Sequence, residues 1–246
     1  MDHESLVDAV RAQGSLLVEV LETDPSVDIP VPTCEEWEIA DLIVHVGAFC
    51  GFWTHVLCEG TGRPKTPYPD PPDGPELVSW LRALTHHLTD ELAATPGATE
   101  VWTWYAPDQS AAFVARRCAH ELAVHRYDAQ SAHGTRSPIP TDLAIDGIEE
   151  IFGALSTLGD RTGLGFGRSL ALRCSDADAA WRITMESDRL DVERPRPAEG
   201  TVRGDLEVTG TASDLELTLY RRPTLSPVEM SGDYSVLDEW YREFRF

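Results

Sequence analysis

The stretch from Arg116 to Asp128, RRCAHELAVHRYD, constrains the fold more than any other part of the chain. It lies within the segment 111–130, which contains neither glycine nor proline and is predicted to form one helix. Because an α-helix turns about 100° per residue, Glu121 and His125 fall about 40° apart, whereas His120 and His125 fall about 140° apart. The zinc-protease pattern H-E-x-x-H places its histidines four residues apart, so the spacing H-E-x-x-x-H argues against that class. Glu121 and His125 are the pair that could bind one ion.

A third ligand has to come from another segment, and His45 is the best candidate. It lies in the apolar stretch from Trp37 to His55, which is predicted to be a second helix. Thr33 is predicted to cap this helix, with Glu36 completing a capping box. Asp41, four residues before His45, could accept a hydrogen bond from its second ring nitrogen. From the residues alone, an alternative to a metal site stays open: His45 and His125 are histidines of the core, and Glu121 is a solvated glutamate.

Two motifs carry a resemblance to a known family. The first contains Trp37, Asp41, Leu42 and His45. The second contains Arg117, His120, Glu121, His125, Arg126, Tyr127, Asp128 and Ala129. With these motifs the chain resembles the mycothiol-dependent maleylpyruvate isomerase family, a branch of the DinB-like metal-binding four-helix bundles. The resemblance implies a divalent metal ion, zinc in the first instance, bound by His45, Glu121 and His125.

The net charge of the chain limits the classes of partner that it is expected to bind. It has 20 basic and 42 acidic residues, a net charge of −22. Such a field repels phosphate backbones and anionic lipids, so neither nucleic acid nor a membrane is expected as a partner. No apolar run approaches the roughly 20 residues of a membrane span. The N-terminus is acidic and lacks the basic start of a signal peptide, and we expect a cytoplasmic protein.

The five cysteines are odd in number, and none are spaced as C-x-x-C, so neither a disulfide framework nor a cysteine-rich zinc knuckle is indicated. Cys118 lies on the same helical stripe as Glu121 and His125 and could reach the metal. Packing on the buried face is the favoured interpretation, because a fourth protein ligand would close the site.

Helical periodicity dominates the first two thirds of the chain. Apolar spacing predicts helices over 5–22, 37–58, 75–94, 111–130 and 141–158. Between the second and third, the segment 59–75 is rich in proline and is predicted to be a stiff loop. We expect a DinB-like metal-binding bundle over residues 1–160.

From Arg168 the pattern changes to alternation, which predicts antiparallel strands near 170–174, 181–185 and 190–192. Another strand is expected over 204–210, a helix or strand over 215–220, and a short amphipathic segment over 238–246. The glycines of 163–167 mark a junction rather than a nucleotide-binding loop. Residues 161–246 resemble the family's sterol-carrier-like C-terminal domain. The expected fold class is mainly α plus α+β: a DinB-like four-helix bundle followed by a small α+β domain.

The resemblance also implies the chemistry. In this family the nucleophile is the thiol of mycothiol, which arrives as a cosubstrate, and a metal ion stabilises its thiolate. Addition to a small electrophile, followed by rotation and expulsion, gives cis–trans isomerisation of a maleylpyruvate-like compound. Trapping of the adduct gives S-conjugation. The chain is therefore expected to be a mycothiol-dependent isomerase or S-transferase that needs a low-molecular-weight thiol and an electrophile.

Either reaction needs a cation to hold the carboxylate or carbonyl of the electrophile. The candidates are Arg117, Arg126, Arg221 and Arg222. Arg222 is expected to be catalytic and to bind the cosubstrates, and Arg117 to assist in that binding. Surface ion pairs are the alternative for each arginine. For the whole protein, the alternatives are a non-catalytic small-molecule binding protein whose metal is structural or absent and, ranked last, a metal-dependent hydrolase.

Overall fold

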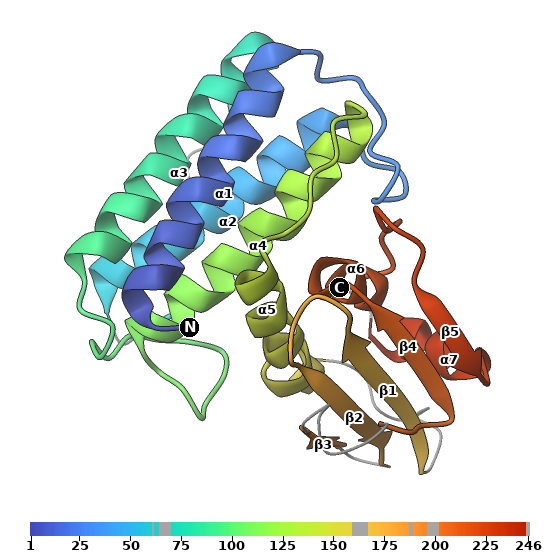
Figure 1. Ribbon diagram of the computed structural model, residues 1–246. Coiled ribbons are helices and arrows are strands. Elements are labelled where there is room, and N and C mark those ends of the chain that lie inside the picture. Colours follow the sequence, from blue (N-terminus) through green and yellow to red (C-terminus); the bar gives the residue numbers. More distant parts are fainter. Residues whose placement is uncertain (61, 64–69, 159–166, 187–188, 196–201, 245–246) are drawn as a thin grey trace. The chain divides into compact units, whose positions relative to one another are not determined.

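The computed structural model describes residues 1–60, 62–63, 70–158, 167–186, 189–195 and 202–244. The chain divides into two compact units, Met1–Ser137 and Pro138–Phe246, which Figure 1 colours in sequence order. The boundary expected between residues 160 and 161 falls in the segment 159–166, outside the described residues. The division between the units lies earlier in the chain.

The N-terminal unit is a four-helix bundle. Its helices are α1 (His3–Thr23), α2 (Ile39–Glu59), α3 (Leu77–Ala94), which follows a short 3₁₀ turn η1 (Gly74–Glu76), and α4 (Ala111–Ala132). α1 contacts α3 and α4, and α2 contacts the same two helices, so the four helices close around one core (Figure 1). The predicted helices and the predicted bundle are confirmed.

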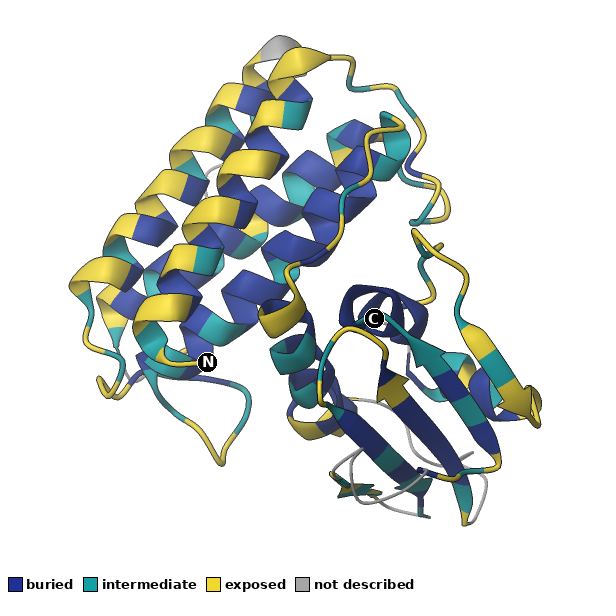
Figure 2. Cartoon of the chain, in the orientation of Figure 1, coloured by how far each residue is buried: buried dark blue, intermediate teal, exposed yellow. Residues whose placement is uncertain are grey.

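Helix α1 is amphipathic, as the spacing of its apolar residues predicted. On α1 the buried apolar residues include Leu6, Val10, Leu17 and Leu21, which lie four or seven residues apart and form one stripe. Figure 2 shows the same division along the bundle, with buried ribbon facing inward and exposed ribbon facing solvent. Burial of these stripes supplies the hydrophobic free energy that holds the bundle together.

α4 differs from the other three helices of the bundle because it is buried on nearly every side. Its buried residues include charged and polar ones, among them Arg117, His125, Arg126 and Asp128. Buried charges are costly unless they are paired or bind an ion. The centre of the bundle therefore contains a polar cluster, and this cluster contains the predicted site.

The start of α2 differs from the prediction. The helix begins at Ile39, and the N–H of Glu38 donates to Asp41 Oδ2 at 2.9 Å. The segment before it forms a turn in which Val31 N–H donates to the carbonyl of Trp37 at 2.8 Å and Glu36 has φ of 68°. The predicted cap at Thr33 is wrong, because this turn keeps residues 33–36 out of the helix.

α2 is also the one described helix long and apolar enough to cross a membrane by length and composition. More than half of its apolar window, 56%, is buried inside the protein. A core helix of a bundle passes the same test for that reason, so the apolar character of α2 is explained by its packing.

The C-terminal unit contains a five-stranded sheet. The strands are β1 (Arg168–Cys174), β2 (Ala180–Met185), β3 (Leu190–Glu193), β4 (Leu206–Gly210) and β5 (Glu229–Gly232), in the order β3-β2-β1-β4-β5. β1 pairs antiparallel with β2, and β2 with β3, as the alternation predicted. β4 joins parallel to β1 and antiparallel to β5.

The helices of this unit are α5 (Thr141–Gly153), followed by the 3₁₀ turn η2 (Leu155–Thr157), α6 (Ala212–Leu219) and α7 (Ser235–Glu243). Leu215 to Leu219, left open as helix or strand, lies in α6. α5 packs on α6, which in turn contacts β1 and β4. This packing explains why the second unit begins before α5 rather than after it. The α+β character of the C-terminal part is confirmed.

Candidate metal centre

The three predicted ligands lie together in the N-terminal unit. His45 is on α2, and Glu121 and His125 are on α4. His45 Nε2 lies 3.0 Å from Glu121 Oε1, and His125 Nε2 lies 3.3 Å from the same oxygen. The two imidazole rings meet edge to face, with centroids 4.8 Å apart. One ligand atom from each residue falls within 4.8 Å of the other two, so the three side chains converge on one point.

These distances can be tested against the requirements of a metal. Ligand atoms held tetrahedrally at about 2.0–2.1 Å from a zinc ion lie about 3.3 Å from one another. The two measured nitrogen–oxygen distances, 3.0 and 3.3 Å, are close to that separation. Two imidazole nitrogens and one carboxylate oxygen also match the ligands of known catalytic zinc sites. The three residues fit a divalent ion.

Asp128 orients one of these ligands. The Nδ1 nitrogen of His125 donates to Asp128 Oδ2 at 2.9 Å, and Asp128 is fully buried. A proton held at Nδ1 leaves the lone pair of Nε2 for a metal, which is the usual arrangement around ligating histidines. Asp41, expected to accept from His45, instead accepts from the backbone at the start of α2.

Arg117 holds the far side of Glu121. Its Nη2 donates to Glu121 Oε2 at 2.7 Å, one helical turn away. Burial raises the pKa of the Glu121 carboxyl, but the Arg117 guanidinium and the hydrogen bonds of His125 and His45 outweigh it. The pKa of Glu121 consequently lies well below its usual range. Glu121 is ready to bind a cation as a carboxylate at any pH near neutrality.

The pKa of His125 is shifted in the opposite direction, to a higher value. Burial lowers the pKa of this imidazole, whereas the hydrogen bonds with Asp128 and Glu121 raise it, and the net effect raises the pKa to about 9. In the absence of an ion, His125 is therefore protonated at neutral pH. An ion that binds Nε2 has to displace this proton, which couples metal binding to pH.

Trp37 and Cys34 also lie at this cluster, although no sequence signal assigned them contacts there. The Trp37 indole lies 5.1 Å from the His45 ring and stacks at 6.3 Å on the His125 ring, centroid to centroid. Cys34 Sγ lies 3.6 Å from Asp128 Oδ2. Both residues belong to the turn before α2, whose course the periodicity of the helices does not specify.

The remaining candidates are placed elsewhere or held by other partners. Cys118 is fully buried and is not one of the three converging residues, in line with the favoured packing role. Arg126 is buried and donates to Gln13, Gln130 and Ser137. These hydrogen bonds place Arg126 within the bundle's own polar network.

Arg221 and Arg222 belong to the C-terminal unit. Arg222 donates from Nη1 to the carbonyl of Tyr220 at 2.8 Å, and its guanidinium lies 5.9 Å from the ring of the same residue. Arg221 has φ of 58° and lies 5.5 Å from the Tyr241 ring. The predicted role of Arg222 stays a prediction.

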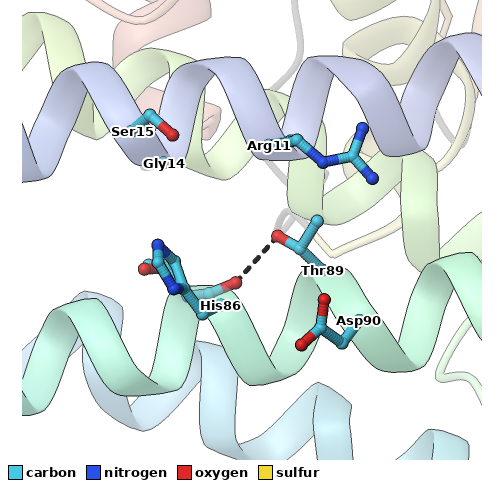
Figure 3. A pocket seen from close by; sticks show the side chains of 7 residues that line it. Arg11, Gly14, Ser15, His86, Thr89 and Asp90 are labelled. Atoms are coloured by element: carbon cyan, nitrogen blue, oxygen red, sulfur yellow. Dashed lines mark hydrogen bonds between the residues drawn. The ribbon is translucent and has the colours of Figure 1, made fainter.

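The bundle also carries surface pockets away from the three ligands. One, of about 190 Å³, lies between α1 and α3 and is lined by residues that include Arg11, His86 and Asp90 (Figure 3). Figure 3 shows Arg11 and Asp90 on facing helices. Its lining also includes Gly14 and two threonines, Thr85 and Thr89, whose hydroxyls bond within α3. It shares no residue with the candidate metal centre of His45, Glu121 and His125.

Comparison with known proteins gives a family match and a fold match. The family described as "Mycothiol maleylpyruvate isomerase N-terminal domain" matches residues 7–130, a segment that contains His45, Glu121 and His125. No curated protein matches the chain. A solved structure of the mycothiol-dependent maleylpyruvate isomerase is 17% identical, with a TM-score of 0.61, over 94% of this chain and 93% of the other.

A second solved structure, a histidine-to-alanine mutant of the same isomerase, is 16% identical, with a TM-score of 0.62. The match covers 89% of this chain and 88% of the other. At this level of identity the two structures show a shared fold, and they show it over both units of the chain.

Proposed function

The chain belongs to the mycothiol maleylpyruvate isomerase N-terminal domain family, and on that premise we propose that it is a metal-dependent, thiol-using enzyme. Its cosubstrate would be mycothiol, and its substrate a small electrophile that resembles maleylpyruvate. The reaction would be cis–trans isomerisation or, where the adduct is trapped, S-conjugation. The single observation that supports this most is the convergence of His45, Glu121 and His125 on one point.

In this proposal the three residues hold one divalent ion, zinc in the first instance. When bound, the ion supplies a positive charge that keeps the thiol of mycothiol as a thiolate at neutral pH. Two neutral imidazoles and one carboxylate leave most of that charge uncompensated. A set of three protein ligands also keeps a position for a small-molecule donor, as catalytic zinc sites do and structural sites do not.

The protein groups around the ligands prepare them for this role. Asp128 fixes the Nδ1 proton of His125, so that Nε2 faces Glu121. The Trp37 indole packs against both imidazole rings and restricts their rotation. Because the ligand orientations are set in the folded protein, little conformational entropy remains to be lost when an ion binds.

The isomerisation consumes nothing. The thiolate sulfur forms a bond to one carbon of the electrophile's double bond, and the π electrons move onto the conjugated carbonyl as an enolate. The carbon–carbon bond, now single, rotates. The electrons then return, the carbon–sulfur bond breaks, and the thiolate is released with the trans product. In conjugation the enolate takes up a proton equivalent to the one that the thiol gave up, so the carbon–sulfur bond remains and the thiol is consumed.

A cation has to hold the electrophile's carboxylate and the developing enolate. We propose Arg222 for this catalytic and binding role, with Arg117 as the second arginine that assists binding. Arg117 lies beside Glu121, which supports its part. No nucleic acid or membrane partner is proposed for a chain of net charge −22, and we propose that the enzyme acts in the cytoplasm.

The proposal is tested by turnover. The purified protein, loaded with zinc, is incubated with maleylpyruvate and with generic electrophiles, in each case with and without mycothiol. We expect turnover that requires the thiol and is lost in His45→Ala but retained in His87→Ala, which removes an exposed histidine of α3. Turnover that ignores the thiol would refute the mechanism. Product analysis decides between isomerase and S-transferase.

A further inference from the structure

The two carboxylate oxygens of Glu121 have separate partners. Oε1 lies between the Nε2 atoms of His45 and His125, at 3.0 and 3.3 Å. Oε2 points the other way and accepts from Arg117 Nη2 at 2.7 Å. The carboxylate is therefore held so that one oxygen faces the point where the ligands converge and the other faces a guanidinium.

This division matters for a metal that has to accept a thiol. A carboxylate binds a metal through one oxygen or through both. With two histidines, a glutamate that uses one oxygen gives three ligand atoms and leaves the fourth position of a tetrahedral ion for another donor. A glutamate that uses both oxygens supplies four ligand atoms, and an incoming thiol then has to compete with Oε2.

We propose that Arg117 is a positioning residue that keeps Glu121 a one-oxygen ligand, and that it thereby reserves a coordination position for the thiol. The inference rests on the proposed function and deepens it. It assigns Arg117 a role on the protein's own ligand, beyond the assistance in substrate binding that the sequence indicated.

The setting of Arg117 suits this role. Arg117, Glu121 and His125 recur every four residues along α4, so they form one stripe of the helix. Arg117 is only 5% exposed, so its ion pair is poorly screened and its side chain has little freedom. A guanidinium is planar and permanently charged, which suits it to hold a carboxylate in one orientation.

The test uses Co²⁺, whose visible absorption reports its coordination. Four-coordinate Co²⁺ absorbs several-fold more strongly than five- or six-coordinate Co²⁺, and a bound thiolate adds a sulfur-to-metal charge-transfer band. The metal-free protein is loaded with Co²⁺ and titrated with β-mercaptoethanol and with mycothiol. The wild type is compared with two variants. Arg117→Gln removes the charge and the planar guanidinium, and Arg117→Lys keeps the charge but not the guanidinium.

The matched control is Arg203→Gln. Arg203 also pairs with a glutamate four residues on, Glu207, at 3.1 Å, but this pair is exposed and lies in the C-terminal unit. Far-ultraviolet circular dichroism and a thermal melt establish that each variant is folded. Arg117→Lys serves as the test variant if Arg117→Gln does not fold.

We expect Arg117→Gln to retain Co²⁺ but to show weaker visible absorption, and to bind either thiol about tenfold or more weakly than the wild type. Arg117→Lys should lie between the two, because an ammonium holds the oxygen through a point charge. The Arg203→Gln control should match the wild type.

An unchanged spectrum with thiol affinity within about twofold of the wild type in Arg117→Gln would overturn the inference and leave the proposed function standing. Loss of Co²⁺ from the folded variant would overturn it as well, since the three ligands are expected to hold the ion without Arg117. A wild-type protein that binds no Co²⁺ overturns the proposed function itself, and the inference with it.

Discussion

Asp128 is expected to control how tightly the centre holds a metal. Its Oδ2 accepts from His125 Nδ1 at 2.9 Å, and the residue is fully buried. Loss of such a partner typically weakens metal binding about 10- to 100-fold, which corresponds to about 1.4 to 2.7 kcal/mol. Asp128→Asn keeps an acceptor oxygen but removes the charge, so it should fall near the lower limit. Asp128→Ala removes both and should fall near the upper limit.

The assay is competition for zinc against a chromophoric chelator of known affinity, at one pH, with the same metal-free preparation of each variant. Circular dichroism and a thermal melt check that the bundle is intact, because Asp128 also lies near Cys34. Zinc affinities of both variants within about twofold of the wild type would refute the reasoning. A larger loss of zinc affinity in Asp128→Asn than in Asp128→Ala would refute the part of the reasoning that rests on hydrogen bonding and charge.

Three further predictions concern pH and packing. The pKa of His125 is raised to about 9, and an ion that binds Nε2 displaces its proton, so zinc affinity should rise about tenfold per pH unit between pH 7 and 9. Calorimetry in buffers of different ionisation enthalpy should detect the released proton. A zinc affinity that does not change with pH would contradict this prediction. Gly47→Ala should destabilise the bundle by about 1–3 kcal/mol, because a Cβ there would lie 2.1 Å from the Trp80 ring; an unchanged melting temperature would contradict it. The N–H and hydroxyl of Ser169 lower the pKa of Asp205, so its stabilisation is present above the unfolded pKa and is lost as pH falls through the folded one. Asp205→Asn should therefore melt below the wild type near pH 7 and converge with it in acid; a constant difference would contradict this.

The sequence predicted those parts of the centre that one helix determines. Glu121 and His125 share α4, so their spacing alone places them on one face. The same spacing places Arg117 beside Glu121, four residues away, although the role predicted for Arg117 was to assist in binding the cosubstrates. His45 lies on a different helix, and helical periodicity does not say which residues of two helices meet. His45 was nevertheless the best candidate for the third ligand from the residues of its own segment, and the resemblance to a family implied the same three residues. The structure brings His45 to the other two.

Helical periodicity could not predict two features, the turn before α2 and the start of the second unit. Thr33 and Glu36 have the spacing of a capping box, but the hydrogen bond from Val31 to Trp37 closes a turn that excludes them from the helix. The same turn brings Trp37 onto the imidazole rings. α5 has the apolar spacing of a bundle helix, yet it packs on α6, and an amphipathic stripe does not specify its partner.

Zinc content tests the central claim most directly. Protein purified without chelator is equilibrated with zinc, freed of loosely bound metal by gel filtration, and analysed by mass spectrometry of the metal. The proposal predicts about one zinc per chain in the wild type and in His87→Ala, and less than about a tenth of that in His45→Ala and Glu121→Ala. A wild-type chain that carries no zinc, or a zinc content that neither ligand substitution changes, would contradict the assignment of these residues to a metal centre.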